Sequence, residues 1–252
     1  MPCVAPSRGF VPTVMPVEIA IIAAMEREVR SLVRHWPRRD LAASDLTLPA
    51  FAGDGVLVIC SGIGARLARQ AAVAVFASHR PRVIVSAGLA GALDSSLEVG
   101  TIFQPATVVD AATGARFNAC GGSGILLTVP SVLDRDAKGR LTGSYGAAAA
   151  DMEAAGVALV AGQHGCGFIA LKAISDVAGF PMPSFERFID ARGRLRTARL
   201  LLASAVRPAR WLALARLGIN SSHASRELSR ALAHLIEQEG AALQPALSGN
   251  RS

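Results

Sequence analysis

Three acidic residues stand where a carboxylate could act on a substrate. Glu28 follows one apolar run, Glu153 begins an alanine-rich segment, and Asp176 ends another apolar run. An ionised carboxylate at the edge of a protein core is costly unless it is paired, solvated or used. Each of these acids could be a helix cap or a surface residue, but they are also candidates for general acid–base chemistry. Asp176 is the most unusual of the three, because it ends an apolar run that is predicted to be a buried strand.

Two glycine-containing loops, SGIGA (61–65) and SAGLAGAL (86–93), each follow an apolar run. GIGARL has two of the three glycines of the dinucleotide fingerprint, with Leu67 at the third position, and no acidic residue closes the next strand. Neither loop has the lysine and hydroxyl of a nucleoside-triphosphate loop. We expect these glycines to let the backbone turn tightly or approach a ligand.

The histidines and cysteines suggest no metal, disulfide or nucleophile site. The five histidines have no metal-ligand spacing: His35, His79, His164, His223 and His234. The four cysteines lie far apart and mostly in apolar runs: Cys3, Cys60, Cys120 and Cys166. This usage favours a reducing cytoplasm, and no Gly-x-Ser-x-Gly nucleophile elbow is found. We therefore expect no metal and no bound cofactor.

The chain alternates apolar, β-branched runs with alanine-rich ones. Strands are predicted at 18–25, 55–62, 82–88 and 168–175, and helices at 65–79 and 151–165. Such alternation predicts an α/β sheet with parallel strands and helices on its faces. Ligands of such sheets bind at the carboxyl ends of the strands. We therefore expect Asp176 and the two glycine-containing loops to meet in one cleft.

The rest of the chain is less regular. Residues 114–146 are glycine-rich, and only a strand at 125–129 is predicted there. Further on, Pro208 is well placed to open a helix. Residues 221–240 carry an apolar helical face: Leu228, Leu232, Leu235 and Ile236. No uninterrupted apolar run reaches the roughly 18 to 20 residues that a bilayer span needs.

Three segments follow from these patterns. Residues 1–14 contain three prolines and no apolar segment of signal-peptide type, so we expect a disordered extension or a misplaced start. Residues 15–190 form the predicted core, since 252 residues that are 51% hydrophobic suffice for one large core. Residues 191–252 form an arginine-rich helical extension, packed on this core or continuing it.

The net charge of +7 is concentrated in the C-terminal part. Between Arg187 and Arg230 there are ten arginines and no lysine, against two acidic residues. Such a cluster can meet nucleic acid, an anionic membrane surface or an acidic substrate, or it can be the solvated face of a helix. The aromatic content of 5% offers little for stacking on single-stranded nucleic acid. Charge alone does not decide between a membrane surface, an acidic substrate and a solvated helix face.

Five ordered blocks resemble the purine nucleoside phosphorylase superfamily. They are IIAAMEREV (21–29), SGIGA (61–65), SAGLAGALDSSLEVGTI (86–102), DMEAAGVA (151–158) and KAISDVAG (172–179). The nearest match is to methylthioadenosine and S-adenosylhomocysteine nucleosidases, over Val17 to Ile189. The resemblance implies a three-layer α/β nucleoside phosphorylase fold with a central mixed sheet, to which a C-terminal helical annex is added.

The resemblance also implies a role for each acid. Asp176 matches the general acid that protonates or hydrogen-bonds purine N7, so that the base can leave an oxocarbenium-like sugar. Glu153 matches the carboxylate that accepts hydrogen bonds from the ribose hydroxyls, with Met152 beside the sugar. Glu28 matches the residue that activates the attacking water in the nucleosidases.

A base and substrate pocket is implied around these acids. Its residues would be Ser175, Leu89, Ala90, Gly91, Phe180 and Phe185. Leu89 stands where the family has a serine, and Lys172 stands where an arginine is common. Gly62, Gly64 and Arg66 form a candidate phosphate site. Phosphate is thus a candidate co-substrate, and hydrolysis and phosphorolysis both stay open.

The arginine-rich C-terminal region is similar to that of hopanoid-associated phosphorylases. This likeness implies removal of adenine from adenosylhopane, which leaves ribosylhopane, in hopanoid biosynthesis. Apolar residues interleaved with arginines also suit an interfacial helix on anionic lipid. The alternative is an amphipathic helix packed on the core or at a dimer interface.

The leading hypothesis is an enzyme, a purine nucleosidase or nucleoside phosphorylase, that acts on a lipid-linked nucleoside. The alternative is a methylthioadenosine/S-adenosylhomocysteine-type nucleosidase or a purine nucleoside phosphorylase. A second class of hypothesis is a catalytically idle module that binds membrane or nucleic acid, and the three acids argue against it. We expect a cytoplasmic homo-oligomer, a dimer or larger, with peripheral membrane contact through the C-terminal segment and no nucleic-acid partner.

Overall fold

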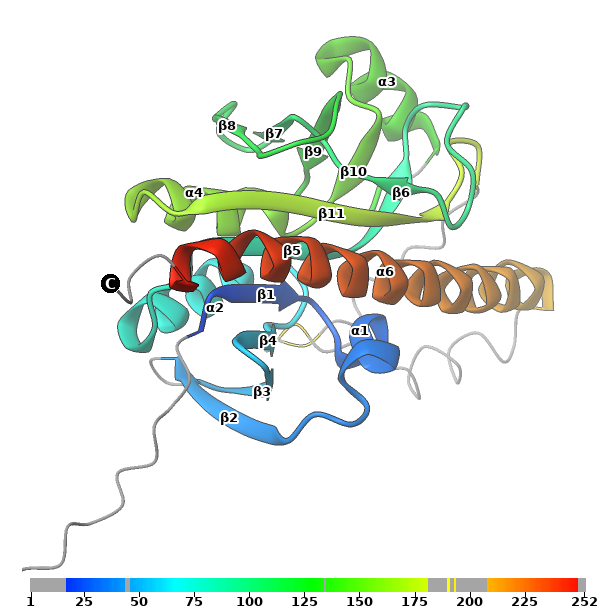
Figure 1. Cartoon of the computed structure of the whole chain (residues 1–252). Coiled ribbons are helices and arrows are strands. Elements are labelled where there is room, and N and C mark those ends of the chain that lie inside the picture. The colour runs from blue at the N-terminus through cyan, green and yellow to red at the C-terminus, as the bar shows by residue number, and fades with distance from the viewer. Residues whose placement is uncertain are drawn as a thin grey trace, which may run out of the picture.

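A computed structural model describes residues 17–43, 46–133, 135–180, 190, 193 and 208–248 (Figure 1). The expected N-terminal extension, Phe185, and most of the arginine-rich stretch before Pro208 lie outside the described residues. The described strands form one 11-stranded sheet.

Four parallel strands make the centre of the sheet, and they coincide with the four predicted apolar runs. They are β1 (Ile19–Ala23), β4 (Val56–Cys60), β5 (Val83–Ala92) and β11 (Gly167–Asp176). β1 lies between β4 and β5, and β11 pairs with β5 in parallel. Because these strands are parallel, their carboxyl ends lie at the same edge of the sheet.

Antiparallel pairs extend the sheet on both sides and make it mixed, as predicted. On one side β2 (Arg38–Ala43) and β3 (Leu46–Gly53) follow β4. On the other side the last residues of β5 pair antiparallel with β10 (Ala149–Asp151). The remaining strands continue from β10 or pair with β11: β9 (Ile125–Thr128), β7 (Thr107–Asp110), β8 (Arg116–Asn118) and β6 (Ile102–Phe103).

Helices cover both faces of the sheet, so the fold has the three predicted layers. Helices α1 (Glu26–Val33) and α6 (Pro208–Ser248) pack on one face, and α2 (Ala65–Ser78) and α4 (Ala154–Gln163) on the other (Figure 1). The side chains of β1 alternate between the two cores, because successive residues of a strand point to opposite faces. A further helix, α3 (Arg135–Tyr145), lies near β9 and β10, in the stretch for which only one strand was predicted.

The long helix α6 is part of this core. It begins at Pro208, as predicted, and the second predicted helical segment continues it without a break. Leu228 and Leu232 are fully buried against the sheet and α1, and Leu235 and Ile236 pack around them. Burying a leucine side chain contributes roughly 1.5 to 3 kcal/mol to the free energy of folding. The packing of α6 on the sheet therefore stabilises the folded protein.

Three sequence expectations can be compared with the described residues. None of their helices is long and apolar enough to cross a membrane. No group of three or more metal-ligating side chains gathers among them. Cys60, Cys120 and Cys166 are all free thiols in this part of the chain.

Candidate active site

A cavity of about 510 Å³ opens at the carboxyl edge of the central strands. Its walls come from the ends of β1, β5, β10 and β11 and from helices α1, α3 and α6. Eight of the predicted site residues line it together: Glu28, Leu89, Ala90, Gly91, Met152, Glu153, Ser175 and Asp176. The predicted meeting of Asp176 with the strand-end loops therefore takes place here.

Asp176 is the last residue of β11, and both of its carboxylate oxygens have partners. The hydroxyl of Ser175 lies 2.8 Å from Oδ1, and the ammonium of Lys138 forms an ion pair with Oδ2. Lys138 also donates to the carbonyl of Val177 at 3.2 Å. Because Asp176 is only 2% exposed, this pairing is what makes a buried charge tolerable there.

Gly91, at the end of β5, makes room for this ion pair. A Cβ at position 91 would lie 2.9 Å from Oδ2 of Asp176 and 3.3 Å from Nζ of Lys138. Since real Cβ atoms essentially never come within 3.0 Å of another heavy atom, a side chain here would displace the pair. The absence of a side chain at position 91 is thus required for the ion pair between Lys138 and Asp176 to form as it does.

Glu28 lies in the first turn of α1, where the helix N-terminus favours negative charge. Its side chain is nevertheless fully buried, and its Oε2 has no hydrogen-bond partner in the described part of the chain. Burial raises the pKa of Glu28 to about 7, although the nearby charges of Arg27 and Lys172 act in the opposite direction. A carboxylate with such a pKa is suited to take a proton near neutral pH.

Glu153 precedes α4 and is held by two backbone N–H groups. Gly64 donates to its Oε1 at 2.8 Å, and Met152 donates to its Oε2 at 3.2 Å. A Cβ on Gly156 would lie 2.1 Å from the carbonyl oxygen of Ala65, so a glycine there lets the starts of α2 and α4 approach. Burial, and then the negative charge of Asp151, raise the pKa of Glu153 to about 8.

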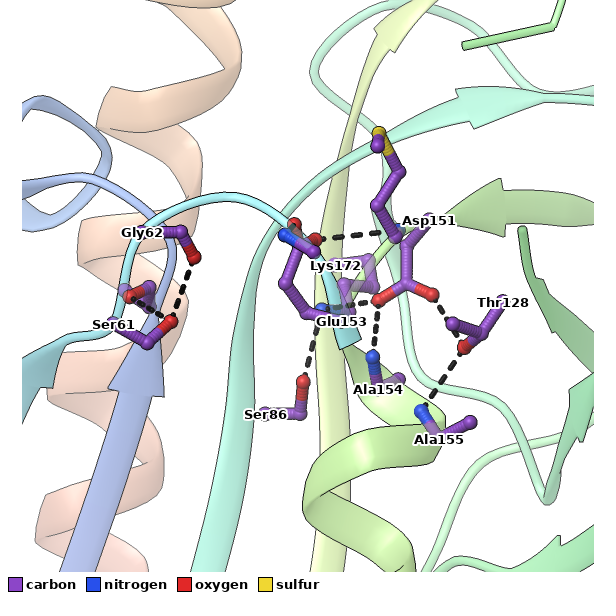
Figure 2. Close-up of polar contacts among 12 residues, drawn as sticks. Ser61, Gly62, Ser86, Thr128, Asp151, Glu153, Ala154, Ala155 and Lys172 are labelled. Carbon is purple, nitrogen blue, oxygen red and sulfur yellow. Dashed lines mark hydrogen bonds and ion pairs between the residues drawn. The ribbon is translucent and has the colours of Figure 1, made fainter. Parts of the chain in front are cut away.

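A buried lysine supports the same end of the site (Figure 2). Nζ of Lys172 lies 2.8 Å from Oδ2 of Asp151 and donates to the hydroxyl of Ser86 at 3.1 Å. Asp151 also accepts the hydroxyl proton of Thr128 at 2.7 Å and the N–H of Ala154 at 2.8 Å. The network ties β10 and β11 to the start of α4, and so fixes the place of Glu153.

The predicted phosphate site is occupied by the protein's own hydrogen bonds. The N–H of Gly62 donates to the carbonyl of Ala24 at 2.9 Å, and that of Gly64 to Glu153. The N–H of Ile63 donates to the carbonyl of Gly193 at 3.0 Å. Arg66 is exposed on α2, donates to Gln70 at 3.2 Å, and is not among the described residues that line the cavity.

Of the two phenylalanines predicted for the pocket, Phe180 is the one within the described residues. Phe180 is buried, but it is not among the described residues that line the cavity. Phe185 lies outside the described residues.

Sequence reasoning missed two contributors to the cavity. Lys138 comes from α3, in the irregular stretch, and α6 adds an apolar and hydroxyl-bearing wall: Leu214, Leu217, Gly218, Ser221, Ser222 and Ser225. The composition contained one indication that Lys138 is unusual, namely the rarity of lysine in this chain. The chain has 26 lysine and arginine residues together, and only Lys138 and Lys172 are lysines. Both are buried against acids that line the cavity.

A family profile and several known proteins match this chain. The profile described as the Phosphorylase superfamily matches residues 18–123 and 111–206. The 5′-methylthioadenosine/S-adenosylhomocysteine nucleosidase of Lysinibacillus sphaericus (strain C3-41) is 27% identical over 228 residues, which cover 75% of this chain and 99% of that protein. The nucleosidase of the same name from Geobacillus sp. (strain WCH70) is 27% identical over 226 residues, which cover 74% and 97%.

Solved structures share the fold. The Helicobacter pylori 5′-methylthioadenosine/S-adenosyl homocysteine nucleosidase superposes with a TM-score of 0.66 at 14% identity, covering 88% of this chain and 99% of that chain. The Arabidopsis thaliana 5′-methylthioadenosine nucleosidase gives 0.63 at 18% identity, with coverages of 87% and 96%. The futalosine hydrolase of Helicobacter pylori strain 26695 gives 0.62 at 14%, with 86% and 97%. Hydrolases with different names therefore share this architecture.

Proposed function

We propose that this chain, which belongs to the phosphorylase superfamily, cleaves the N-glycosidic bond of a 5′-modified adenosine and releases adenine. One observation carries the proposal: Glu28, Glu153 and Asp176 meet in a single cavity. Its volume of about 510 Å³ lies within the usual range for small-molecule sites. The relatives that match most of the chain are nucleosidases by name.

The acids divide the work of breaking the bond. As the C1′–N9 bond lengthens, the sugar becomes cationic and the base gains electrons. The enzyme must therefore stabilise the positive charge on the sugar and the negative charge on the base in the transition state. Asp176, with its partners, faces the base. Glu153, held by Gly64 and Met152, accepts hydrogen bonds from the ribose hydroxyls. These hydroxyl donors favour its ionised form, so bound substrate lowers the pKa of Glu153 from the value of about 8.

Water is the nucleophile in this proposal. Glu28 has an Oε2 without a partner among the described residues and a pKa of about 7, which suits a base that takes a proton from water. A phosphate dianion would be repelled by an ionised Glu28. The N–H groups of Gly62, Ile63 and Gly64 already have protein acceptors. Phosphorolysis is the alternative, and its product would be a sugar 1-phosphate instead of a free sugar.

The 5′ substituent in this proposal is apolar and large, with adenosylhopane as the candidate substrate. In support, α6 lines the cavity with Leu214 and Leu217, and Ile219, beside Gly218 of the wall, is 69% exposed. A hopanoid ring system together with adenosine would exceed the cavity, so the rings would extend along α6. The competing substrate is methylthioadenosine, whose small substituent the cavity would enclose.

The proposed setting follows from such a substrate. A lipid-linked nucleoside lies in a membrane, so we place the protein in the cytoplasm with peripheral contact on the inner face of the membrane. A homo-oligomer, a dimer or larger, is part of the same proposal. Sedimentation with anionic liposomes at low and high salt, and measurement of the solution mass, would test the two points separately.

The decisive experiment measures adenine release by the purified full-length protein. Adenosylhopane, methylthioadenosine, S-adenosylhomocysteine and adenosine are each supplied with and without phosphate, and products are separated by liquid chromatography. We expect adenine from adenosylhopane, a free sugar as the second product, and no dependence on phosphate. Phosphate-dependent formation of a sugar 1-phosphate would assign phosphorolysis. Adenine from none of the four nucleosides would refute the proposed activity, and liposome binding without base release would favour an idle binding module.

A further inference from the structure

Lys138 lines the cavity beside Asp176, the acid that faces the leaving base in the proposed function, and is 4% exposed. Its ammonium pairs with Oδ2 of Asp176 and donates to the carbonyl of Val177 at 3.2 Å. The other oxygen of Asp176 lies 2.8 Å from the hydroxyl of Ser175. Both oxygens of Asp176 therefore meet donors, and one of these donors is the side-chain nitrogen of Lys138.

A leaving purine needs a proton at N7, and a carboxylate surrounded by donors has none to give. An ordinary carboxyl group holds its proton only below about pH 4, whereas an ammonium group keeps it to about pH 10. A lysine–carboxylate pair is neutral before it gives up a proton and carries one negative charge afterwards. It therefore changes charge just as a single protonated carboxyl group does.

The choice between lysine and arginine in this chain is consistent with proton donation by Lys138. All lysine and arginine positions other than Lys138 and Lys172 are arginines, and an arginine side chain is not deprotonated in proteins. A lysine can release its proton in a buried site. Lys172 is committed to Asp151 and Ser86, so among the described residues that line the cavity Lys138 is the lysine beside the base-end acid.

We propose that Lys138 supplies the proton to the leaving base and that Asp176 holds the ammonium in place and balances its charge. The inference rests on the proposed function. The N–H bond at Nζ breaks as the N7–H bond forms, and the electron pair of the C1′–N9 bond moves into the purine. Adenine leaves neutral, and Lys138 remains as a neutral amine. Water adds to C1′ and gives a proton to Glu28, and solvent then restores both groups.

Other charged groups of the cavity belong to the same pH dependence. Arg27 and Glu28 come from α1, Asp151 from β10, and Glu153 from the start of α4. Glu28 and Glu153 have pKa values raised to about 7 and about 8, so their titration shapes the profile near neutral pH in every variant. The test is therefore the difference between variant and wild-type profiles.

The experiment compares Lys138→Met, Lys138→Arg and the wild type in kcat/KM for adenine release between pH 5 and pH 10. Lys138→Met should lose about 100-fold or more at pH 8 and regain activity towards pH 5, where carboxyl groups in general begin to take up protons. Lys138→Arg restores the charge but cannot donate, so it should not restore activity at pH 8. Arg140→Met, on the exposed side of the same helix, is the matched control and should behave as the wild type.

A second substrate separates proton donation from structural damage. The 4-nitrophenyl analogue of the same 5′-modified riboside has a leaving group that departs as an anion without a proton. Lys138→Met should release 4-nitrophenol within about threefold of the wild-type rate while its adenine release is lost by about 100-fold. An equal loss with both substrates, a profile of wild-type shape, or full recovery in Lys138→Arg would overturn the role of Lys138. A wild type that releases no adenine would overturn the proposed function itself, and this role with it.

Discussion

At the scale of single residues, the site combines acids whose environments differ. Asp176 has donors at both oxygens, Glu153 accepts two backbone N–H groups, and Oε2 of Glu28 is buried without a partner among the described residues. Groups of one chemical type can perform different tasks when their surroundings differ. Two predictions concern these side chains directly.

The first residue-scale prediction is that Asp176→Asn abolishes adenine release. The amide cannot balance the buried ammonium of Lys138, so the proton donor loses both its position and its charge partner. We expect kcat/KM to fall by roughly 100- to 10,000-fold, while circular dichroism shows an unchanged fold. Asp94→Asn, an exposed acid after β5, is the control and should keep full activity. Turnover of Asp176→Asn within tenfold of the wild type would contradict the assignment.

The second prediction concerns stability and pH at Glu28. Its pKa is about 7 in the folded chain against an ordinary value of 4.5, so the folded state binds the proton more tightly than the unfolded state. This stabilisation is fully present below pH 4.5 and is lost as pH rises to about 7. Glu28→Gln removes the titration. The variant should match the wild type at pH 4.5 and exceed its free energy of unfolding by about 3 kcal/mol at pH 8.5.

Urea unfolding at the two pH values measures this difference. Glu26→Gln, an exposed glutamate in the same helical turn, is the control and should show no change in the pH dependence. A stability difference for Glu28→Gln that is the same at both pH values would show that Glu28 is not held neutral by burial. The variant should also lose adenine release, because the amide cannot take a proton from water.

At the scale of elements, the position of the site is set by the end of β5, where two other strands pair with it. β5 pairs with β11 in parallel and with β10 in antiparallel fashion, which brings Asp176 and Asp151 to the two sides of one strand end. The register of β5 and β11 shifts between Ile174 and Asp176, immediately before the acid that lines the cavity. Irregularities of this kind redirect side chains near active sites.

Gly91→Ala tests this arrangement. The added Cβ would lie 2.9 Å from Oδ2 of Asp176, so the ion pair with Lys138 must move. We expect a loss of adenine release of at least tenfold and a lower melting temperature, since a packed site is sensitive to small displacements. The control is Gly139→Ala on α3, where a Cβ meets nothing within 4 Å. It should keep activity and raise stability by up to about 1 kcal/mol. Equal activities of the two variants would contradict the proposed crowding.

At the scale of the whole molecule, the predicted three-layer fold is confirmed, and so is an enzyme of the purine nucleosidase and nucleoside phosphorylase class. The C-terminal helix α6 connects the core to the cavity. Its later turns pack Leu228 and Leu232 against the sheet, and its earlier turns bring Leu214 and Leu217 to the cavity. One continuous helix thus contributes both to the packed core and to the cavity wall.

Leu228→Ala measures the first of these contributions. The side chain is fully buried between α6 and the sheet, so the variant should lose about 2 to 5 kcal/mol of unfolding free energy. Arg230→Ala, two residues further on and exposed, should change stability by less than about 0.5 kcal/mol. Chemical denaturation of both variants provides the comparison. Equal stabilities would mean that α6 is a dispensable addition to the core.

The sequence by itself determined the class of fold and the positions of the three acids. Apolar period, strand ends and alternation of element types are local properties, so β1, β4, β5 and β11 could be predicted from their own residues. The resemblance to a family added a role for each acid. Asp176, Glu153 and Glu28 indeed lie in one cavity.

Only the tertiary structure decided which groups surround these acids. α3 contains two glycines and little apolar periodicity, so its sequence does not specify a helix, and Lys138 could not be placed. Lys138 and Asp176 are 38 residues apart, and Gly64 and Glu153 are 89 apart. Such pairs depend on the order and register of strands across the whole sheet. Three features of the site follow from that long-range packing and from no local pattern. They are the ion pair of Asp176 with Lys138, the hydrogen bonds made by the N–H groups of loop 61–65, and the cavity wall that α6 supplies.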